Sequence, residues 1–231
     1  MDGGLERPPG HLQNNVSSSD LKSTSSALQT NEQLHTQPQS STYQLIVGLP
    51  IPTHVQLVLD VAIPVFTTTF AHTCSKADME EYITSNFTFD KMLAELNNPN
   101  KRFILALAPS GECAGFAHLT IGSTEPCLSH IPTSDMVELQ RIYVGLAHHG
   151  SGLGKLLMDS AISIGQKEGF EWVWLGVYEE NKRAKRFYEK LGFEMVGTHE
   201  FWLGSDRQID EIYLRKVVPE PESRISELES N

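Results

Sequence analysis

The feature that most constrains this fold is a glycine-rich loop placed directly before a helix, in the stretch HHGSGLGKLL from His148 to Leu157. Glycine lets the backbone approach a ligand closely, and the first turn of a helix presents N–H groups without intrahelical partners. This combination is typical of a site that holds a phosphate. Apolar residues at core-facing spacing then predict a helix over about 152–169.

Two common phosphate loops do not match this stretch. The loop of nucleoside triphosphatases needs a glycine where His149 stands and a hydroxyl where Leu156 stands. The dinucleotide fingerprint needs GxGxxG, and here the spacing is GxGxG, late in the chain. A glycine-rich turn without a ligand is the remaining alternative.

The rest of the chain alternates strand and helix signals, which predicts a mixed α/β fold. Strands are expected over 43–49, 102–108, 113–122, 136–144, 172–177, 193–204 and 210–216, and further helices over about 53–71, 75–87, 88–98 and 181–191. Thr53, Ser75 and Thr88 are the expected N-caps of the first three of these helices, and Pro64 is a candidate kink.

Composition divides the chain into three parts. Residues 1–42 are rich in Ser, Thr and Gln and are expected to be a disordered tail, because they cannot bury enough apolar area. Residues 217–231 are expected to be an acidic disordered tail, which leaves 43–216 as the folded domain. The three cysteines form no CxxC pair, so we expect neither a disulfide framework nor a metal site.

Net charge restricts the partners. The formal charge of −11 argues against nucleic acid and is compatible with a cationic substrate. No stretch reaches the ~18 apolar residues of a membrane span, and the N-terminus lacks a signal-peptide pattern. We therefore expect a cytoplasmic protein that does not enter the membrane; nuclear entry and a homodimer are both compatible with the sequence.

Two segments that flank the loop give it a specific interpretation. VELQRIYV precedes the loop, and NKRAKRFYEKLGF follows it some thirty residues later. Over about residues 44–216 the chain resembles the GNAT superfamily of acetyl-CoA-dependent N-acetyltransferases. Their pyrophosphate loop, Gln/Arg-x-x-Gly-x-Gly/Ala, corresponds to residues 149–154, with His149 in place of Gln or Arg. The resemblance implies a GNAT fold, a central sheet of about six to seven strands that splays at the cofactor cleft, and no metal.

The resemblance also implies the site residues. Acetyl-CoA as cosubstrate is expected to contact Ile142, Tyr143, Val144, His149, Gly150, Ser151, Gly152, Leu153, Gly154, Lys155, Asn181 and Ala184. Tyr188 is implied as the general acid that protonates the departing thiolate, and Glu138 is the candidate base. The alternatives are that Tyr188 is a core aromatic, Glu138 a solvent-facing strand residue, and His149 and Lys155 solvated side chains.

A finer likeness concerns the acceptor. The stretch VFTTTFAHTCSKADMEEYITSNFTFDKMLAELNNP and the ending Gly197, His199, Phe201, Gly204, Gln208, Asp210 are similar to the PaiA-type spermidine/spermine N-acetyltransferases. A small amine, with polyamines first, is therefore the expected acceptor. Acids and aromatic residues available for such a cleft are Glu80, Glu81, Glu179, Glu180, Asp210, Tyr82, Trp172, Trp174, Phe201 and Trp202, with His118 as a further candidate. For any single one of them, the interpretation as a solvated acid or a core aromatic is favoured over a substrate contact. Acetylation of a peptide, protein or drug amine, or a non-catalytic acyl-CoA sensor, are the alternatives for the function.

Overall fold

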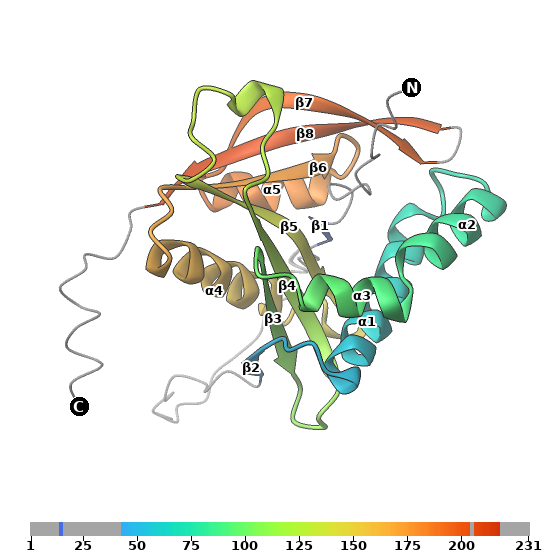
Figure 1. The fold of residues 1–231 in the computed structure, drawn as a ribbon. Helices are drawn as coiled ribbons and strands as arrows, with labels where there is room; N and C mark the ends of the chain where they lie inside the picture. The colour runs from blue at the N-terminus through green and yellow to red at the C-terminus, as the bar shows by residue number, and fades with distance from the viewer. Residues whose placement is uncertain (1–13, 16–42, 204–205, 218–231) are drawn as a thin grey trace, which may run out of the picture.

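The computed structural model describes residues 14–15, 43–203 and 206–217, and the side chains of all of these except 14–15, 201–203 and 206. A single mixed sheet runs through it in the order β2-β3-β4-β5-β6-β8-β7 (Figure 1). Along this path the strands are antiparallel except for β5 and β6, which are parallel. The predicted GNAT-type α/β fold is therefore confirmed.

The strands of the sheet carry the apolar runs that the sequence predicts. They are β2 (Gln44–Val47), β3 (Lys101–Leu107), β4 (Cys113–Ile121), β5 (Met136–Val144), β6 (Trp172–Tyr178), β7 (Glu194–Leu203) and β8 (Asp206–Lys216). Strands β7 and β8 form the hairpin that closes the domain, and β8 begins four residues earlier than predicted.

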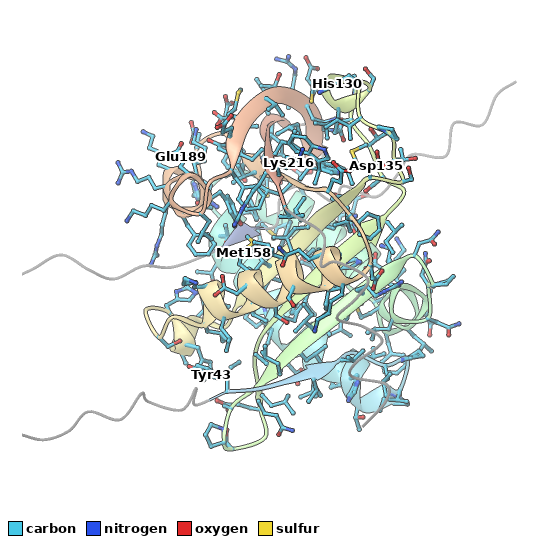
Figure 2. The ribbon with its side chains drawn as sticks, turned by 90° about the vertical axis from the view of Figure 1, so that its left-hand side faces the viewer. Tyr43, His130, Asp135, Met158, Glu189 and Lys216 are labelled. Carbon is cyan, nitrogen blue, oxygen red and sulfur yellow. The ribbon has the colours of Figure 1, made fainter. Side chains whose placement is uncertain are left out.

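Helices cover the two faces of the sheet in separate groups. They are α1 (Pro52–Phe70), α2 (Lys76–Asn86), α3 (Phe89–Leu96), α4 (Leu153–Lys167) and α5 (Lys182–Lys190), with short 3-10 turns η1 (Pro126–Leu128) and η2 (Leu146–His148). One apolar cluster joins α4 and α5 to their face, and a second joins α1, α2 and α3 to the opposite face. Figure 1 shows the first group apart from the second, and Figure 2 looks onto the face where Met158 of α4 lies.

Two of the three predicted helix caps are confirmed. Ser75 accepts a hydrogen bond from the backbone N–H of Asp78, and Thr88 accepts one from Lys91. The cap predicted at Thr53 is wrong. Helix α1 begins at Pro52 with Ile51 in the cap position and no side-chain cap, because proline at the first helical position has no N–H to satisfy.

Helix α1 is long and apolar enough, by length and composition, to cross a membrane. Its 18-residue window has a mean hydropathy of 1.2, and 44% of that window is buried inside the fold. Val55, Val58 and Phe66 are among the residues that pack in the cluster under α1–α3. The apolar character of α1 is thus accounted for by its place in the core of the sheet.

One short strand comes from the region expected to be a tail. Strand β1 (Asn14–Asn15) pairs in parallel with Ile142 and Tyr143 of β5. The rest of residues 1–42, residues 218–231 and Gly204 lie outside the described residues. The division into tails and a domain at 43–216 stays a prediction.

Candidate active site

The site is built around an opening between β5 and β6. These parallel strands pair only over Met136–Glu138 and Trp172–Trp174, and beyond that point they are not paired with each other. The predicted splay of the sheet is therefore present. Along this opening, the edge of β5 at Ile142 and Tyr143 carries strand β1.

A β-bulge in β5 decides which side chains face each side of the opening. His118 of β4 is opposite Arg141, whereas the next residue, Leu119, is opposite Leu139, so Gln140 is an extra residue on β5. Leu139 and Ile142, three residues apart, consequently both pack under α4. Glu138 and Arg141 are placed together on the opposite face by the same bulge.

The glycine loop has the geometry that the sequence predicts. Gly150 and Gly152 have φ of 78° and 81°, in the left-handed region that favours glycine. Gly152 is the N-cap of α4 and provides no side-chain cap, and a Cβ placed on it would meet open space. The first turn of α4 therefore presents backbone N–H groups toward an uncrowded surface.

Two histidines fix the loop to the sheet. His149 donates from Nε2 to the carbonyl of Val144 at 3.0 Å, and burial holds the pKa of His149 below its ordinary value. His148 contacts the Tyr43 hydroxyl through Nδ1 and the Glu112 carboxylate through Nε2, both at 3.2 Å. Figure 2 shows Tyr43 at the end of the sheet where this loop lies.

The loop's other predicted contacts differ in their surroundings. Ser151 donates to the carbonyl of His148 at 2.7 Å, and Leu153 and Gly154 are buried in the first turn of α4. Lys155 is exposed and pairs with Asp159 one turn along, at 2.5 Å. This matches the alternative in which Lys155 is a solvated surface residue.

Helix α5 places the second part of the predicted site. Asn181 caps this helix by accepting a hydrogen bond from the N–H of Ala184 at 3.1 Å, and Ala184 is fully buried. Tyr188 lies one turn beyond Ala184 on the same side of the helix. The cap therefore holds both residues against the sheet beside the opening.

Tyr188 is buried among aromatic rings, yet its hydroxyl is not satisfied. Phe187 and Phe193 meet its ring edge-on, with centroids at 5.4 and 5.9 Å. The hydroxyl has no hydrogen-bond partner among the described residues, and burial raises its pKa well above 10. A buried polar group without a partner is costly, so the phenol is suited to a group that the described part of the chain does not provide.

Glu138 lies on the other face of the sheet. Its neighbours Val137 and Leu139 pack under α4, so Glu138 points to the face opposite α4, and its side chain is 2% exposed. The solvent-facing alternative for Glu138 is therefore wrong. Glu138 and Tyr188 stand on opposite faces of the sheet, beside the same opening between β5 and β6.

The acids and aromatic residues proposed for the acceptor cleft do not all come together. Asp210 and Trp174 are fully buried. Both point to the same face as Glu138: Trp174 is opposite Glu138, and Asp210 is opposite Tyr178, an even number of residues from Trp174 on β6. Glu80, Glu81, Glu179 and Glu180 are exposed, and Tyr82 packs against Phe66 under α1. Trp172 contacts Lys216 near the other end of the sheet, and the side chains of Phe201 and Trp202 lie outside the described residues.

Some residues of this region were missed by sequence reasoning. Glu125 pairs with His199 at 3.0 Å and is buried on the face of the sheet where Glu138 lies, called the acceptor face below, although no motif marks Glu125. Arg183 on α5 lies close enough to His149 to contribute to the lowered pKa of that histidine, after burial. Only the tertiary contacts between distant segments reveal these residues.

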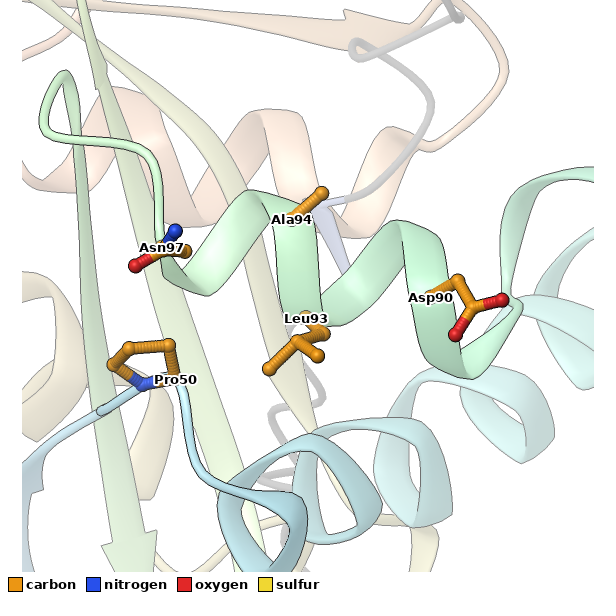
Figure 3. Close-up of a pocket in the computed structure, with 5 residues that line it drawn as sticks. All are labelled: Pro50, Asp90, Leu93, Ala94 and Asn97. Atoms are coloured by element: carbon orange, nitrogen blue, oxygen red, sulfur yellow. The ribbon is translucent and has the colours of Figure 1, made fainter.

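A surface pocket lies apart from the predicted site residues. A pocket of about 440 Å³ lies between α3 and the connection from β2 to α1, lined by Pro50, Asp90, Leu93, Ala94 and Asn97 (Figure 3). None of the predicted site residues lines it. Within the described part of the chain, no group of three or more His, Cys, Asp or Glu residues is arranged to hold a metal ion.

The fold and the loop are those of a class of acyl-transferring enzymes, and comparison with known proteins identifies the family within that class. The sequence model of the acetyltransferase (GNAT) family matches residues 66–193. The chain belongs to this family and is an acetyl-CoA-dependent N-acetyltransferase.

Relatives and solved structures agree with that assignment. An uncharacterized N-acetyltransferase of Lactobacillus delbrueckii subsp. lactis is 32% identical over 157 residues, which are 66% of this chain and 86% of that protein. One from Mycobacterium tuberculosis is 32% identical over 154 residues, covering 65% and 92%. The PaiA N-acetyltransferase of Thermoplasma acidophilum, solved with coenzyme A, has a similar fold, with a TM-score of 0.59, 22% identity, and coverage of 75% and 99%.

Proposed function

We propose that this enzyme transfers the acetyl group of acetyl-CoA to a primary amine of a polyamine, by direct attack within a ternary complex. The observation that carries the acceptor class is the burial of two carboxylates, Glu138 of β5 and Asp210 of β8, on one face of the sheet with strand β6 between them. The likeness to the PaiA-type enzymes supports the same acceptor.

The glycine loop fits the pyrophosphate of coenzyme A. In this proposal, backbone N–H groups of the loop and of the first turn of α4 donate to the anionic oxygens, and an anion there would gain about 0.3–1 kcal/mol from the helix dipole. The N–H of Ser151 is not among these donors, because it donates to the carbonyl of His148 at 3.4 Å. The missing Cβ atoms at Gly150 and Gly152 leave room for close approach. The pantetheine arm would then run along Ile142, Tyr143 and Val144 in the place that β1 occupies at the edge of β5, with the side-chain N–H groups of Asn181 as donors to it.

The orphaned phenol of Tyr188 fits the sulfur end of the cosubstrate. In the reaction the amine nitrogen forms a bond to the thioester carbonyl carbon, and the bond from that carbon to sulfur breaks. The sulfur leaves with the electron pair and takes the proton of the Tyr188 hydroxyl. A phenol of ordinary pKa is already protonated at neutral pH, and burial, which raises the pKa of Tyr188, holds the proton on it until the thiolate leaves.

Glu138 is the proposed acceptor of the amine proton. An alkylammonium of pKa about 10.4 is only about one thousandth neutral near pH 7.4, which costs about 4 kcal/mol. A carboxylate on the acceptor face, acting directly or through a water, removes that proton as the nitrogen attacks. The base and the acid then work from opposite faces of the sheet.

The spacing of the two buried carboxylates suits an extended polyamine. Glu138 is beside Trp174, which lies four residues from Tyr178, and Tyr178 is opposite Asp210. With strands about 4.8 Å apart and about 3.3 Å per residue, the two acids are about 16 Å apart. The terminal nitrogens of extended spermidine and spermine are separated by nine and thirteen bonds, or about 11 and 16 Å.

An amine panel tests this proposal. The full chain is incubated with acetyl-CoA and, in turn, spermine, spermidine, propylamine, a lysine-containing peptide and a peptide with a free N-terminus, and free thiol is measured. We expect the polyamines to give a kcat/KM at least tenfold above propylamine. Turnover of the peptides without turnover of spermidine would replace polyamines by peptide amines, and acetyl-CoA binding without thiol release from any amine would identify a sensor.

A further inference from the structure

The bulge in β5 is held by a chain of partly buried hydrogen bonds. The side-chain oxygen of Gln140, the extra residue, accepts a hydrogen bond from Lys101 at 3.1 Å and another from the Thr120 hydroxyl at 2.9 Å. Both acceptor positions of that oxygen are thereby filled. His118 lies 3.4 Å from the same Thr120 hydroxyl, through its Nε2.

The single hydroxyl proton of Thr120 determines which groups donate and which accept in this chain. Because Thr120 donates its only hydroxyl proton to Gln140, its oxygen accepts from His118, which must carry a proton on Nε2. Burial, with Arg141 and Lys101 nearby, holds the pKa of His118 well below 6.5, so the imidazole is neutral. His118 also stacks on Phe103 at 4.1 Å between ring centroids. The chain from His118 to Lys101 therefore has one orientation.

The residue after the bulge is held from a different element. Arg141 donates to Oε2 of Glu95 on α3 at 2.5 Å, and Oε1 of Glu95 pairs with Lys101 at 3.4 Å. Although burial raises the pKa of Glu95, Arg141 and Lys101 lower it below its ordinary value. A single ionised carboxylate on α3 thus ties Arg141, the residue after the bulge, to Lys101 of β3, which in turn binds Gln140.

The bulge has a direct geometric consequence for Glu138. If β5 alternated regularly, with no bulge at Gln140, Glu138 and Arg141 would lie on opposite faces of the sheet, and Leu139 and Ile142 could not both pack under α4. We propose that Gln140, clamped by Lys101 and Thr120, is a positioning residue that fixes the bulge and so directs Glu138 toward the acceptor while β5 keeps its edge toward the cosubstrate. The inference rests on the proposed role of Glu138 as the base.

The test removes the acceptor oxygen and then restores it. Gln140→Met has nearly the same length but cannot accept hydrogen bonds, whereas Gln140→Glu retains oxygens for Lys101 and Thr120. We expect Gln140→Met to lose about 10- to 100-fold in kcat at pH 7.5, as a displaced catalytic group does. We expect Gln140→Glu to stay within threefold of the wild type.

A matched control separates positioning from stability. Arg102 follows Lys101 on β3 and binds Glu168 at the end of α4 through two bonds, at 2.7 and 3.0 Å. Arg102→Met removes a comparable polar link away from the bulge. We expect it to lower the melting temperature without changing kcat per folded molecule.

The pH profile provides a second readout that a merely structural role would not move. At pH 9.5 a larger fraction of the amine is neutral, and the base is needed less. The deficit of Gln140→Met should therefore shrink to about threefold there. A deficit that stays constant with pH, one that Arg102→Met shares in proportion to lost stability, or an equal deficit in Gln140→Glu, overturns the proposal.

Two further measurements keep the test decisive. Thr120→Val removes one of the two hydrogen bonds to Gln140 and should show a smaller deficit in kcat, with the same pH dependence. This variant provides the test if Gln140→Met does not fold. A wild-type kcat in Thr120→Val would count against the clamp. Amide hydrogen exchange over residues 136–145 should rise in Gln140→Met and not in Arg102→Met. A wild-type enzyme that acetylates no amine refutes the proposed function, whereas an active wild type with a fully active Gln140→Met refutes only the clamp.

Discussion

Replacement of Tyr188 by phenylalanine should have opposite effects on activity and stability. The ring would remain in place between Phe187 and Phe193, and only the hydroxyl would be lost. That hydroxyl has no partner among the described residues, so its removal relieves a desolvated group. The melting temperature should stay constant or rise, by at most the equivalent of about 1 kcal/mol, or 2–4 °C.

The loss of activity can be given a magnitude from the chemistry of the leaving group. A positioned general acid contributes about 10²- to 10⁴-fold. The pKa of an alkyl thiol, about 8.5, is close to neutral pH, so the departing thiolate needs a proton only moderately. We therefore expect the low end of the range, a decrease in kcat of about 100-fold, or about 2.7 kcal/mol. The KM for acetyl-CoA should change less than threefold, since the phenol acts mainly in the transition state.

The assay is steady-state thiol release with saturating amine, combined with thermal unfolding of the same samples. Tyr213 provides the matched control. It is 6.5 Å from Tyr188 between ring centroids, and its hydroxyl donates to Glu211 at 3.1 Å and lies 3.3 Å from Glu189. Tyr213→Phe should therefore lose about 1–2 kcal/mol of stability and keep its kcat.

The reasoning is refuted if Tyr188→Phe turns over at the wild-type rate, because another group or water then protonates the sulfur. It is equally refuted if Tyr188→Phe and Tyr213→Phe lose stability to the same extent. In that case the hydroxyl of Tyr188 has a structural partner in the folded protein.

Three other perturbations have defined outcomes. Gly152→Glu should abolish acetyl-CoA binding in calorimetry, because it sets a carboxylate against phosphate, whereas Gly111→Glu, at a similar φ of 87° in another loop, should bind normally; equal binding would contradict the loop assignment. Burial holds the pKa of His118 below 6.5, so the unfolded chain binds the extra proton as pH falls and stability should drop by up to about 1.4 kcal/mol per unit below pH 6.5. His118→Gln should flatten that slope in urea titrations, and an unchanged slope would assign it to other groups. Deletion of residues 1–42 removes β1 from the edge of β5 and should lower the KM for acetyl-CoA without changing the melting temperature; an unchanged KM would show that β1 does not compete.

Local chemistry made much of the fold predictable. The strand and helix order, the caps at Ser75 and Thr88, and the left-handed glycines of the loop follow from residue types whose preferences act over a few neighbours. The cap at Thr53 was wrong because Pro52 begins the helix, which places the N-cap two positions earlier, at Ile51. Composition could not reveal that residues 14–15 pair with β5, since this contact joins segments more than a hundred residues apart.

The site was predictable only where a linear motif carries it. The loop at 149–154 and the segment from Asn181 to Tyr188 could be found because the residues of each motif lie within a few positions of one another in the sequence. Their spacing alone therefore indicates which residues act together. Lys155 belonged to the same motif, yet its side chain turned out to pair with Asp159 on the surface.

The sequence by itself therefore determined the class of enzyme and the phosphate-binding loop, because the backbone geometry of a loop and a helix start depends on the types of consecutive residues. Only the tertiary structure decided that Glu138 is buried on the face of the sheet opposite to that of Tyr188, and that Gln140 is an extra residue in β5. The physical reason is that the face of a strand depends on its register with its neighbours. One inserted residue changes that face, and the contacts that hold the insertion come from Lys101 and Thr120 on other strands.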